Sequence, residues 1–156
     1  MHKKIIVRIV KLVSLTINSI WTIPTFIIIF IISPFHKIKI GKIRTDRIGH
    51  FGLQLGILTS KIKDLDKINT TYLFCFDYYI ANSYLAKISK RELNIFYLVK
   101  YLYELAMFLP FLKYYIVDWN IDRDIDGLMY EHPISFNFSK IESEIAKNWL
   151  KKYGWK

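Results

Sequence analysis

Apolar and polar positions divide the chain into a long uncharged stretch near the N-terminus and shorter patterned segments after it. From Leu12 to Phe35, 24 consecutive residues carry no ionisable side chain. Within residues 4–20, apolar residues recur at helical spacing on one face, namely Ile5, Ile9, Leu12, Ile17 and Ile20. The other face carries the bases Lys4, Arg8 and Lys11. This arrangement predicts a basic amphipathic helix of the kind that lies at a membrane surface.

Residues 1–36 therefore form a predicted membrane anchor or interfacial helix, with alternatives that stay open. The stretch is long enough for a single tilted span. It also fits an in-plane helix followed by a shallow apolar segment, Ile20–Ile32, broken at Pro24. A helix buried in a protein core is the third alternative. A cleaved signal peptide fits poorly, since Ser33-Pro34-Phe35-His36 has no small-x-small site.

The rest of the chain alternates between strand-like and helix-like patterns. Ile38–Arg44 alternates apolar and polar residues, and Thr70–Phe76 is rich in β-branched and aromatic residues, so both predict strands. Further strand candidates are Leu93–Val99 and Tyr114–Val117. Helices are predicted from near His50, over Asn82–Arg91, over Lys100–Leu109 up to Pro110, and from the capping box at Ser139 to Tyr153, with Gly154 as its stop.

Strands that alternate with helices predict βαβ units and a parallel sheet. We therefore expect residues 37–156 to form one α/β domain, a small Rossmann-like parallel sheet with flanking helices. A capped helix at the end of such a domain usually leads into another strand, so we expect this domain to be incomplete.

The positive charge is concentrated in the first third of the chain. The whole sequence has a net charge of +10, and residues 1–60 hold nine bases and one acid, or +8 of that total. Bases flank the uncharged stretch on both sides. This favours a location at the cytoplasmic face of the inner membrane, where both flanks meet anionic lipid, and it makes membrane lipid an expected partner.

Several classes of protein are excluded by composition and spacing. Cys75 is alone, so a disulfide scaffold is excluded, and it is expected to be a small buried residue. No zinc spacing, phosphate-binding Walker loop or nucleic-acid module occurs, so neither a cofactor nor a nucleic-acid partner is expected. Eight aromatic residues in Leu93–Tyr115 indicate either core packing or an apolar surface that touches the bilayer or a lipid-linked acceptor.

The loop between the first predicted strand and the helix after it is the strongest candidate site. It contains Arg44, Arg47, Gly49 and His50. Ligands of open parallel sheets bind at the carboxyl ends of strands, and a helix N-terminus offers N–H groups to an anion. The arginines suit phosphate, and the histidine suits a general base. The competing interpretations are lipid-headgroup contacts for the arginines and a capping or core role for His50.

A second candidate segment is Asp122-Arg123-Asp124-Ile125-Asp126-Gly127, which matches the first half of a calcium loop. The twelfth position of that loop is Pro133, where a bidentate Glu is required. The segment is therefore expected to be a solvated turn, and no metal site is predicted.

The order of several motifs resembles a family of bacterial glycosyltransferases of the GT-B type, associated with cell-surface polysaccharide assembly. The specific motif is Arg44-x-x-Arg47-Ile48-Gly49-His50-Phe51. Supporting matches follow it in the same order: Asn82-Ser83-Tyr84-Leu85, Lys90-Arg91, Asp124-x-Asp126-Gly127-Leu128, Ser135-Phe136 and Phe138-Ser139, with Glu142 or Glu144, Leu150 and Gly154. The resemblance covers about residues 37–156.

The resemblance implies half of a GT-B fold, namely its acceptor-side N-terminal domain. Arg44, Arg47 and Gly49 would line the interdomain cleft, and His50 would act as base toward the acceptor hydroxyl. The family's second Rossmann-like domain, which binds the nucleotide-sugar, has no counterpart in this sequence. Two hypotheses follow: the N-terminal portion of a membrane-associated transferase that acts on a lipid-linked glycan, or a non-enzymatic membrane scaffold or partner subunit.

Overall fold

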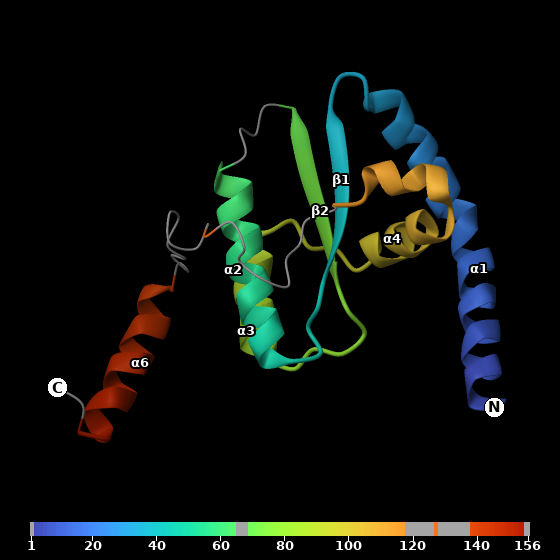
Figure 1. Cartoon of the computed structure of the whole chain (residues 1–156). Helices are drawn as coiled ribbons and strands as arrows, with labels where there is room; N and C mark the ends of the chain where they lie inside the picture. The colour runs from blue at the N-terminus through green and yellow to red at the C-terminus, as the bar shows by residue number, and fades with distance from the viewer. Residues whose placement is uncertain (1, 65–68, 118–126, 128–137, 155–156) are drawn as a thin grey trace.

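A computed structural model describes residues 2–64, 69–117, 127 and 138–154 (Figure 1). In chain order the elements are α1 (His2–Ile32), β1 (Lys37–Ile43), α2 (Ile48–Asp64), β2 (Thr70–Phe76), α3 (Ser83–Glu92), α4 (Val99–Phe108), the 3-10 helix η1 (Pro110–Tyr115) and α6 (Lys140–Lys152). This is the predicted α/β class, with a small parallel sheet and flanking helices.

The sheet has two full strands, and a single bridge extends it on each side. β1 and β2 are parallel, with Lys37 opposite Thr70 and Ile43 opposite Phe76. Ile116 forms a parallel bridge to Ile40 of β1, and Ile95 forms one to Phe74 of β2. The spatial order is therefore Ile95, β2, β1, Ile116. Counted along the chain this order is 3-2-1-4, so its direction reverses, at a switch point, between β1 and Ile116, although only β1 and β2 are full strands.

The predicted third and fourth strands thus shrink to single bridges. Leu93–Val99 makes one ladder contact before α4 begins at Val99, and Pro110–Tyr115 is a 3-10 helix, where Tyr114–Val117 was a strand candidate. Pro110 explains the second difference, because it ends α4 and sits in the first turn of η1. The other predicted elements agree with the structure to within about two residues, as is usual for element ends.

Helices cover both faces of the sheet and create two separate cores (Figure 1). On one face, Ile43 and Phe74 pack with Phe51 and Leu55 of α2 and with Ile88 of α3. On the other face, Ile40 and Cys75 pack with residues of α4 and η1, and α1 lies outside α4 and adds Phe26 and Ile29. Alternate strand residues supply the two cores, as the pleat requires.

Gly41 is needed where β1 and β2 meet. A Cβ atom at this position would lie 2.5 Å from Cε1 of Phe74 and 2.6 Å from its Cδ1. Because the Phe74 ring is almost fully buried, it has little room to move. The absence of a side chain at Gly41 lets this ring fill the core shared with α2 and α3.

α1 continues through Pro24, so the predicted break there is wrong. Proline removes the N–H that would bond to the carbonyl of Ile20. The neighbouring carbonyl, that of Trp21, accepts a hydrogen bond from the Thr25 hydroxyl at 2.7 Å. One turn earlier, the Thr22 hydroxyl donates to the Asn18 carbonyl at 2.9 Å. Packing of Phe26 and Ile29 in the core with α4 holds the helix together just after the proline.

In the described part of the chain, no helix combines the length and the apolar character that crossing a membrane requires. The N-terminal membrane-spanning helix predicted as one alternative for residues 1–36 is therefore not supported. The core-helix alternative is met in part, because Phe26 and Ile29 are buried against α4 while Ile23 and Ile27 stay exposed.

Candidate functional site

The loop that carries the predicted site follows the carboxyl end of β1, the strand next to the switch point of the sheet. We call residues 44–50 the arginine loop. Its backbone is fixed from inside the protein: the Arg44 N–H donates to Oε1 of Gln54 at 2.8 Å, and Gln54 and Thr45 are buried. The loop therefore has a defined conformation that the fold imposes.

The two arginines of the loop share one carboxylate. Nε of Arg44 lies 3.8 Å from Oδ1 of Asp46, and Nε of Arg47 lies 4.0 Å from Oδ2 of the same side chain. All three side chains are exposed to solvent, Arg47 most of all. Exposed pairs at these distances are weak. A phosphate at the loop can therefore compete for both guanidinium groups.

Gly49 and His50 lie in the first turn of α2, directly after the arginines. Gly49 is exposed, and a Cβ atom there would meet nothing within 4 Å, so the fold does not require glycine at this position. His50 is half-buried. The structure therefore gathers the four predicted site residues on one loop and helix start.

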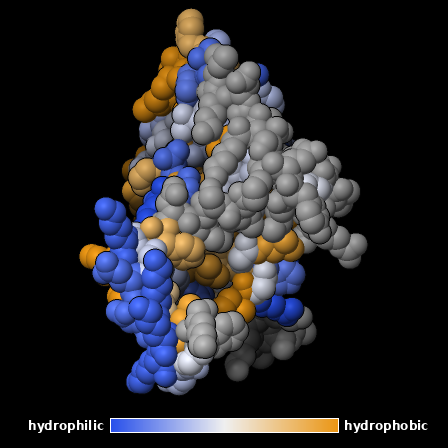
Figure 2. Space-filling model, turned by 90° about the vertical axis from the view of Figure 1, so that its left-hand side faces the viewer, coloured by the Kyte–Doolittle hydropathy of each residue, from blue (hydrophilic) through white to orange (hydrophobic). Residues whose placement is uncertain are grey.

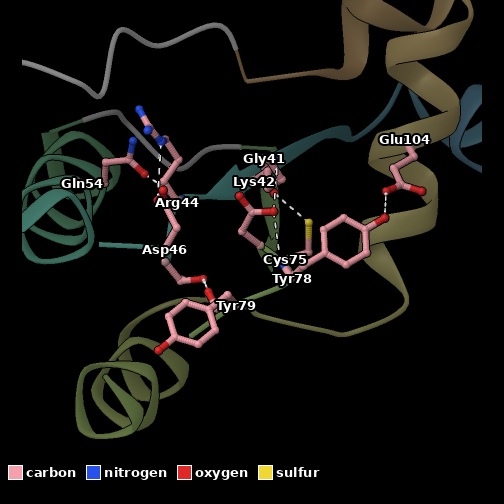
Figure 3. A network of polar contacts seen from close by, with 11 residues as sticks. Gly41, Lys42, Arg44, Asp46, Gln54, Cys75, Tyr78, Tyr79 and Glu104 are labelled. Carbon is pink, nitrogen blue, oxygen red and sulfur yellow. Dashed lines mark hydrogen bonds and ion pairs between the residues drawn. The ribbon is translucent and has the colours of Figure 1, made fainter. Parts of the chain in front are cut away.

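The loop after β2 is tied to the arginine loop. The Asp77 N–H donates to the Ile43 carbonyl at 3.1 Å, and the Ala81 N–H donates to the Thr45 carbonyl at 2.8 Å. Lys42 and Asp77 form an ion pair with a separation of 3.6 Å. Figure 3 shows Gln54 beside Arg44 at the end of β1, and the Tyr78 hydroxyl directed to Glu104 after the end of β2.

A pocket opens at the same edge of the sheet, beside the end of β2. It has a volume of about 360 Å³, and we call it the carboxyl-edge pocket. Its lining includes Asp77, Tyr78, Lys90, Phe96, Tyr97 and Lys100. The four predicted site residues are not among the described residues that line this pocket. The edge thus offers two neighbouring cationic areas, the arginine loop and this pocket.

Lys100, Tyr78 and Glu104 are linked to one another at the pocket. Nζ of Lys100 lies 3.3 Å from the centroid of the Tyr78 ring, a close cation–π contact. The Tyr78 hydroxyl donates to Oε1 of Glu104 at 2.6 Å. Burial, and then the carboxylate of Glu104, raise the pKa of the Tyr78 hydroxyl well above its ordinary value, so it remains a neutral donor.

Cys75 lines the inner end of the pocket but is not a nucleophile. Burial raises the pKa of its thiol to about 12, against a smaller lowering by Lys42 and Lys100. The thiol lies 3.7 Å from the Gly41 carbonyl, in the direction of a weak S–H donor. Cys75 is therefore the small buried residue that its position in β2 predicts.

Among the described residues, no cluster of three or more His, Cys, Asp or Glu side chains could hold a metal ion. The acidic segment 122–126 and residues 135–136 of the resemblance lie outside the described residues. Of that region, Gly127 is described, with a positive φ of 68° that suits glycine.

Sequence reasoning missed Tyr78 and Lys100 as pocket residues. Ligands of open parallel sheets bind at the carboxyl ends of strands, and this holds for β2 as it does for β1. The rule would have selected the residues after Phe76. Lys100 gave no local signal, because only the packing of α4 on the sheet brings its first turn beside Tyr78.

Comparison with known proteins identifies no family for this chain. No protein-family model matches the chain, and neither the curated proteins nor the solved structures include a significant match to it.

Proposed function

We propose that the chain is the acceptor-side N-terminal part of a membrane-associated GT-B-type glycosyltransferase. It would serve the transfer of a sugar from a nucleotide-sugar to a lipid-linked glycan acceptor. The acceptor's phosphate binds at the arginine loop, and the nucleotide-sugar binds in a second domain. The acceptor oxygen attacks C1 of the sugar, the C1–O bond to the diphosphate breaks with its electron pair, and His50 takes the acceptor's proton.

The observation that carries this proposal is the position of Arg44 and Arg47. They follow the strand beside the switch point of the sheet, where open α/β sheets bind their ligands. The hydrogen bond from the Arg44 N–H to the Gln54 side chain fixes the loop before any ligand arrives. A preformed site with two guanidinium groups suits a phosphate.

The carboxyl-edge pocket supports a carbohydrate acceptor with negative charge. Tyr78 and Tyr97 present exposed aromatic surface that a sugar ring can cover, and their hydroxyls add polar groups. Lys90 and Lys100 supply positive charge at the same place. A pocket that combines apolar walls with a few convergent polar groups is typical of small-molecule sites.

Membrane attachment is assigned to α1 in its in-plane form. Phe26 and Ile29 of α1 pack in the core with α4, and α1 runs down one side of the molecule (Figure 1). The charge of residues 1–60 would hold this helix on the anionic cytoplasmic face of the inner membrane.

A second candidate function is a non-enzymatic membrane scaffold or partner subunit. The observation in its favour is α6, which has no buried residue and exposes Ile141, Ile145 and Trp149 at helical spacing. An apolar stripe of this kind suits docking to another protein.

Calorimetry with two ligands tests the acceptor site. We expect the purified chain to bind a short isoprenoid diphosphate and to show no binding of UDP-glucose. Replacing Arg44 and Arg47 together with Ala is expected to weaken diphosphate binding about tenfold or more, the loss of roughly 1.4 kcal/mol. The control is the Lys147→Ala, Lys151→Ala variant, which removes the same charge from α6. Equal effects of the two double variants, or tight UDP-glucose binding, would contradict the proposal.

His50 is tested once a donor-binding partner domain restores transfer. His50→Ala is expected to lower the rate by about 10²-fold or more, since general-base catalysis contributes that much. His50→Gln should not rescue the rate, because it keeps polarity without a basic nitrogen. An unchanged rate in either variant would remove His50 as the base and favour the scaffold hypothesis.

A further inference from the structure

One face of the molecule exposes far more apolar surface than a solvated domain needs. Along α1, residues Ile20, Ile23, Ile27 and Ile31 form a stripe at helical spacing, and each is at least 49% exposed. The opposite side of α1 is also apolar and buries Phe26 and Ile29 against α4. A helix that is apolar all round is normally covered on every side.

A second element continues this exposed apolar surface. Met107 and Phe108 at the end of α4, and Phe111 in η1, are all exposed, Phe111 by 73%. Between η1 and α1 runs an apolar groove of about 600 Å³. It is lined by Ile23, Ile27 and Phe30 from α1 and by Leu109 and Phe111 from the other side, and no charged side chain is among its described lining residues.

Lysine and tyrosine residues mark the rim of this groove. Tyr114 lines it, and Nζ of Lys39 lies 4.2 Å from the centroid of the Tyr114 ring and donates to the Tyr114 carbonyl. Lys113 is exposed beside it in η1. Tyrosine and lysine beside an apolar surface are typical of side chains at the boundary between hydrocarbon and headgroups.

Figure 2 views the molecule from the side of α6, where hydrophilic and hydrophobic side chains intermingle. In Figure 1, α1 lies on the side of the molecule away from α6.

We propose that α1, the end of α4 and η1 together form one bilayer-docking face, whose groove holds an acyl chain of an anionic phospholipid. Lys39 and Lys113 at the rim, together with the four bases of residues 3–11 in the same helix as the apolar stripe, favour this occupant. A second copy of the chain would bring the same positive charge to the interface, whereas anionic headgroups neutralise it. The inference rests on the proposed membrane attachment of α1, adds η1 to it, and is independent of sugar transfer.

Flotation with lipid vesicles tests the docking face. The full chain is expected to bind vesicles that mix phosphatidylcholine with phosphatidylglycerol. Replacing Phe108 and Phe111 with Ser is expected to lower the partition coefficient about tenfold. The matched control replaces Phe138 and Tyr153 with Ser, which are similarly exposed at the two ends of α6, and it should bind like the wild type. Circular dichroism checks that each variant is folded.

A variant in α1 separates this inference from the attachment it rests on. Ile27→Ser with Ile31→Ser should also weaken vesicle binding. If only the α1 variant loses binding, attachment by α1 stands and the η1 part of the face is wrong. If the wild type does not bind, both are wrong.

An environment-sensitive dye on Phe111→Cys identifies the occupant directly. Cys75 is buried, so the new thiol is labelled selectively in the folded chain. The dye is expected to shift to the blue when vesicles are added, and a dye on Lys147→Cys should not. A blue shift without vesicles that grows with protein concentration would instead show a second copy on this face and would overturn the proposal.

Discussion

At the scale of single residues, the two glycines next to the candidate site have opposite roles. Gly41 is held by packing, because Phe74 occupies the space of its missing side chain. Gly49 is free of such a constraint although it belongs to the motif of the resemblance. From the sequence alone, Gly49 was the glycine expected to matter more, because it lies in the candidate loop, whereas Gly41 was only one position of a predicted strand.

Gly41→Ala is expected to lower the free energy of unfolding by about 1–3 kcal/mol, the usual cost of overpacking a core. Gly49→Ala should leave it unchanged or raise it by up to about 1 kcal/mol, because alanine is favoured in helices and has space here. Urea unfolding of both variants measures the difference. A stable Gly41→Ala protein would mean that Phe74 can move aside.

Cys75 gives a second expectation at this scale. Burial raises the pKa of its thiol to about 12, so at mildly alkaline pH the thiol stays protonated in the folded chain. A thiol reagent should label it only through opening of the core, at a rate that rises steeply with urea. Fast labelling without denaturant, at the rate of a free thiol, would contradict the buried position of β2.

At the scale of elements, the Glu142 carboxylate of α6 forms ion pairs with two basic residues of α3. Arg91 donates two hydrogen bonds to the Glu142 carboxylate, at 2.8 and 2.7 Å, and Lys87 lies 3.6 Å from it. Glu142 also completes the capping box with Ser139. One carboxylate therefore both starts α6 and attaches it to the rest of the domain.

The Arg91 guanidinium, and then the Ser139 N–H, hold the pKa of Glu142 well below its ordinary value of 4.5. Because the pKa is lowered, this contact contributes its full stability above pH 4.5. That stability is lost progressively as the pH falls from 4.5 through the lowered pKa of the folded protein. Glu142→Gln keeps an acceptor for Ser139 but removes the charge. We expect it to increase hydrogen exchange in residues 140–152 several-fold at neutral pH.

The control for this experiment is Glu144→Gln, which removes the same charge from the same helix. Exchange in α3 serves as an internal reference, because its N-cap Asn82 and its buried residues are untouched. Equal exchange in the two variants would show that the contact with Arg91 does not hold α6.

At the scale of the whole molecule, two surfaces differ in chemical character. The carboxyl edge of the sheet gathers charge and aromatic rings, while α1 and η1 gather exposed apolar side chains. In Figure 1, α1 runs along one side of the sheet, and the arginine loop lies at the carboxyl end of β1.

Salt dependence follows from that division. Vesicle binding should fall as sodium chloride is raised from about 0.05 to about 0.5 M, because screening weakens the attraction to anionic lipid. The residual binding in high salt measures the apolar contribution and should be smallest in the Phe108, Phe111 variant. Binding that is insensitive to salt would contradict the assignment of an anionic lipid.

How far the sequence predicts the fold depends on the range of the interactions. Ser139 and Glu142 form the expected capping box, and Asn82 begins α3, because these contacts span only three residues. The strand at Thr70–Phe76 has the predicted bounds. Pro24 alone suggested a break, whereas packing against α4, far along the chain, keeps α1 continuous.

The sequence by itself determined the parallel α/β class, both full strands, the helix starts and the loop that carries Arg44, Arg47, Gly49 and His50. The tertiary structure decided the order Ile95, β2, β1, Ile116, the pocket that joins Tyr78 to Lys100, and the groove between α1 and η1. The reason is physical: caps and periodicity act within a few residues, whereas pairing and burial join residues far apart in the chain.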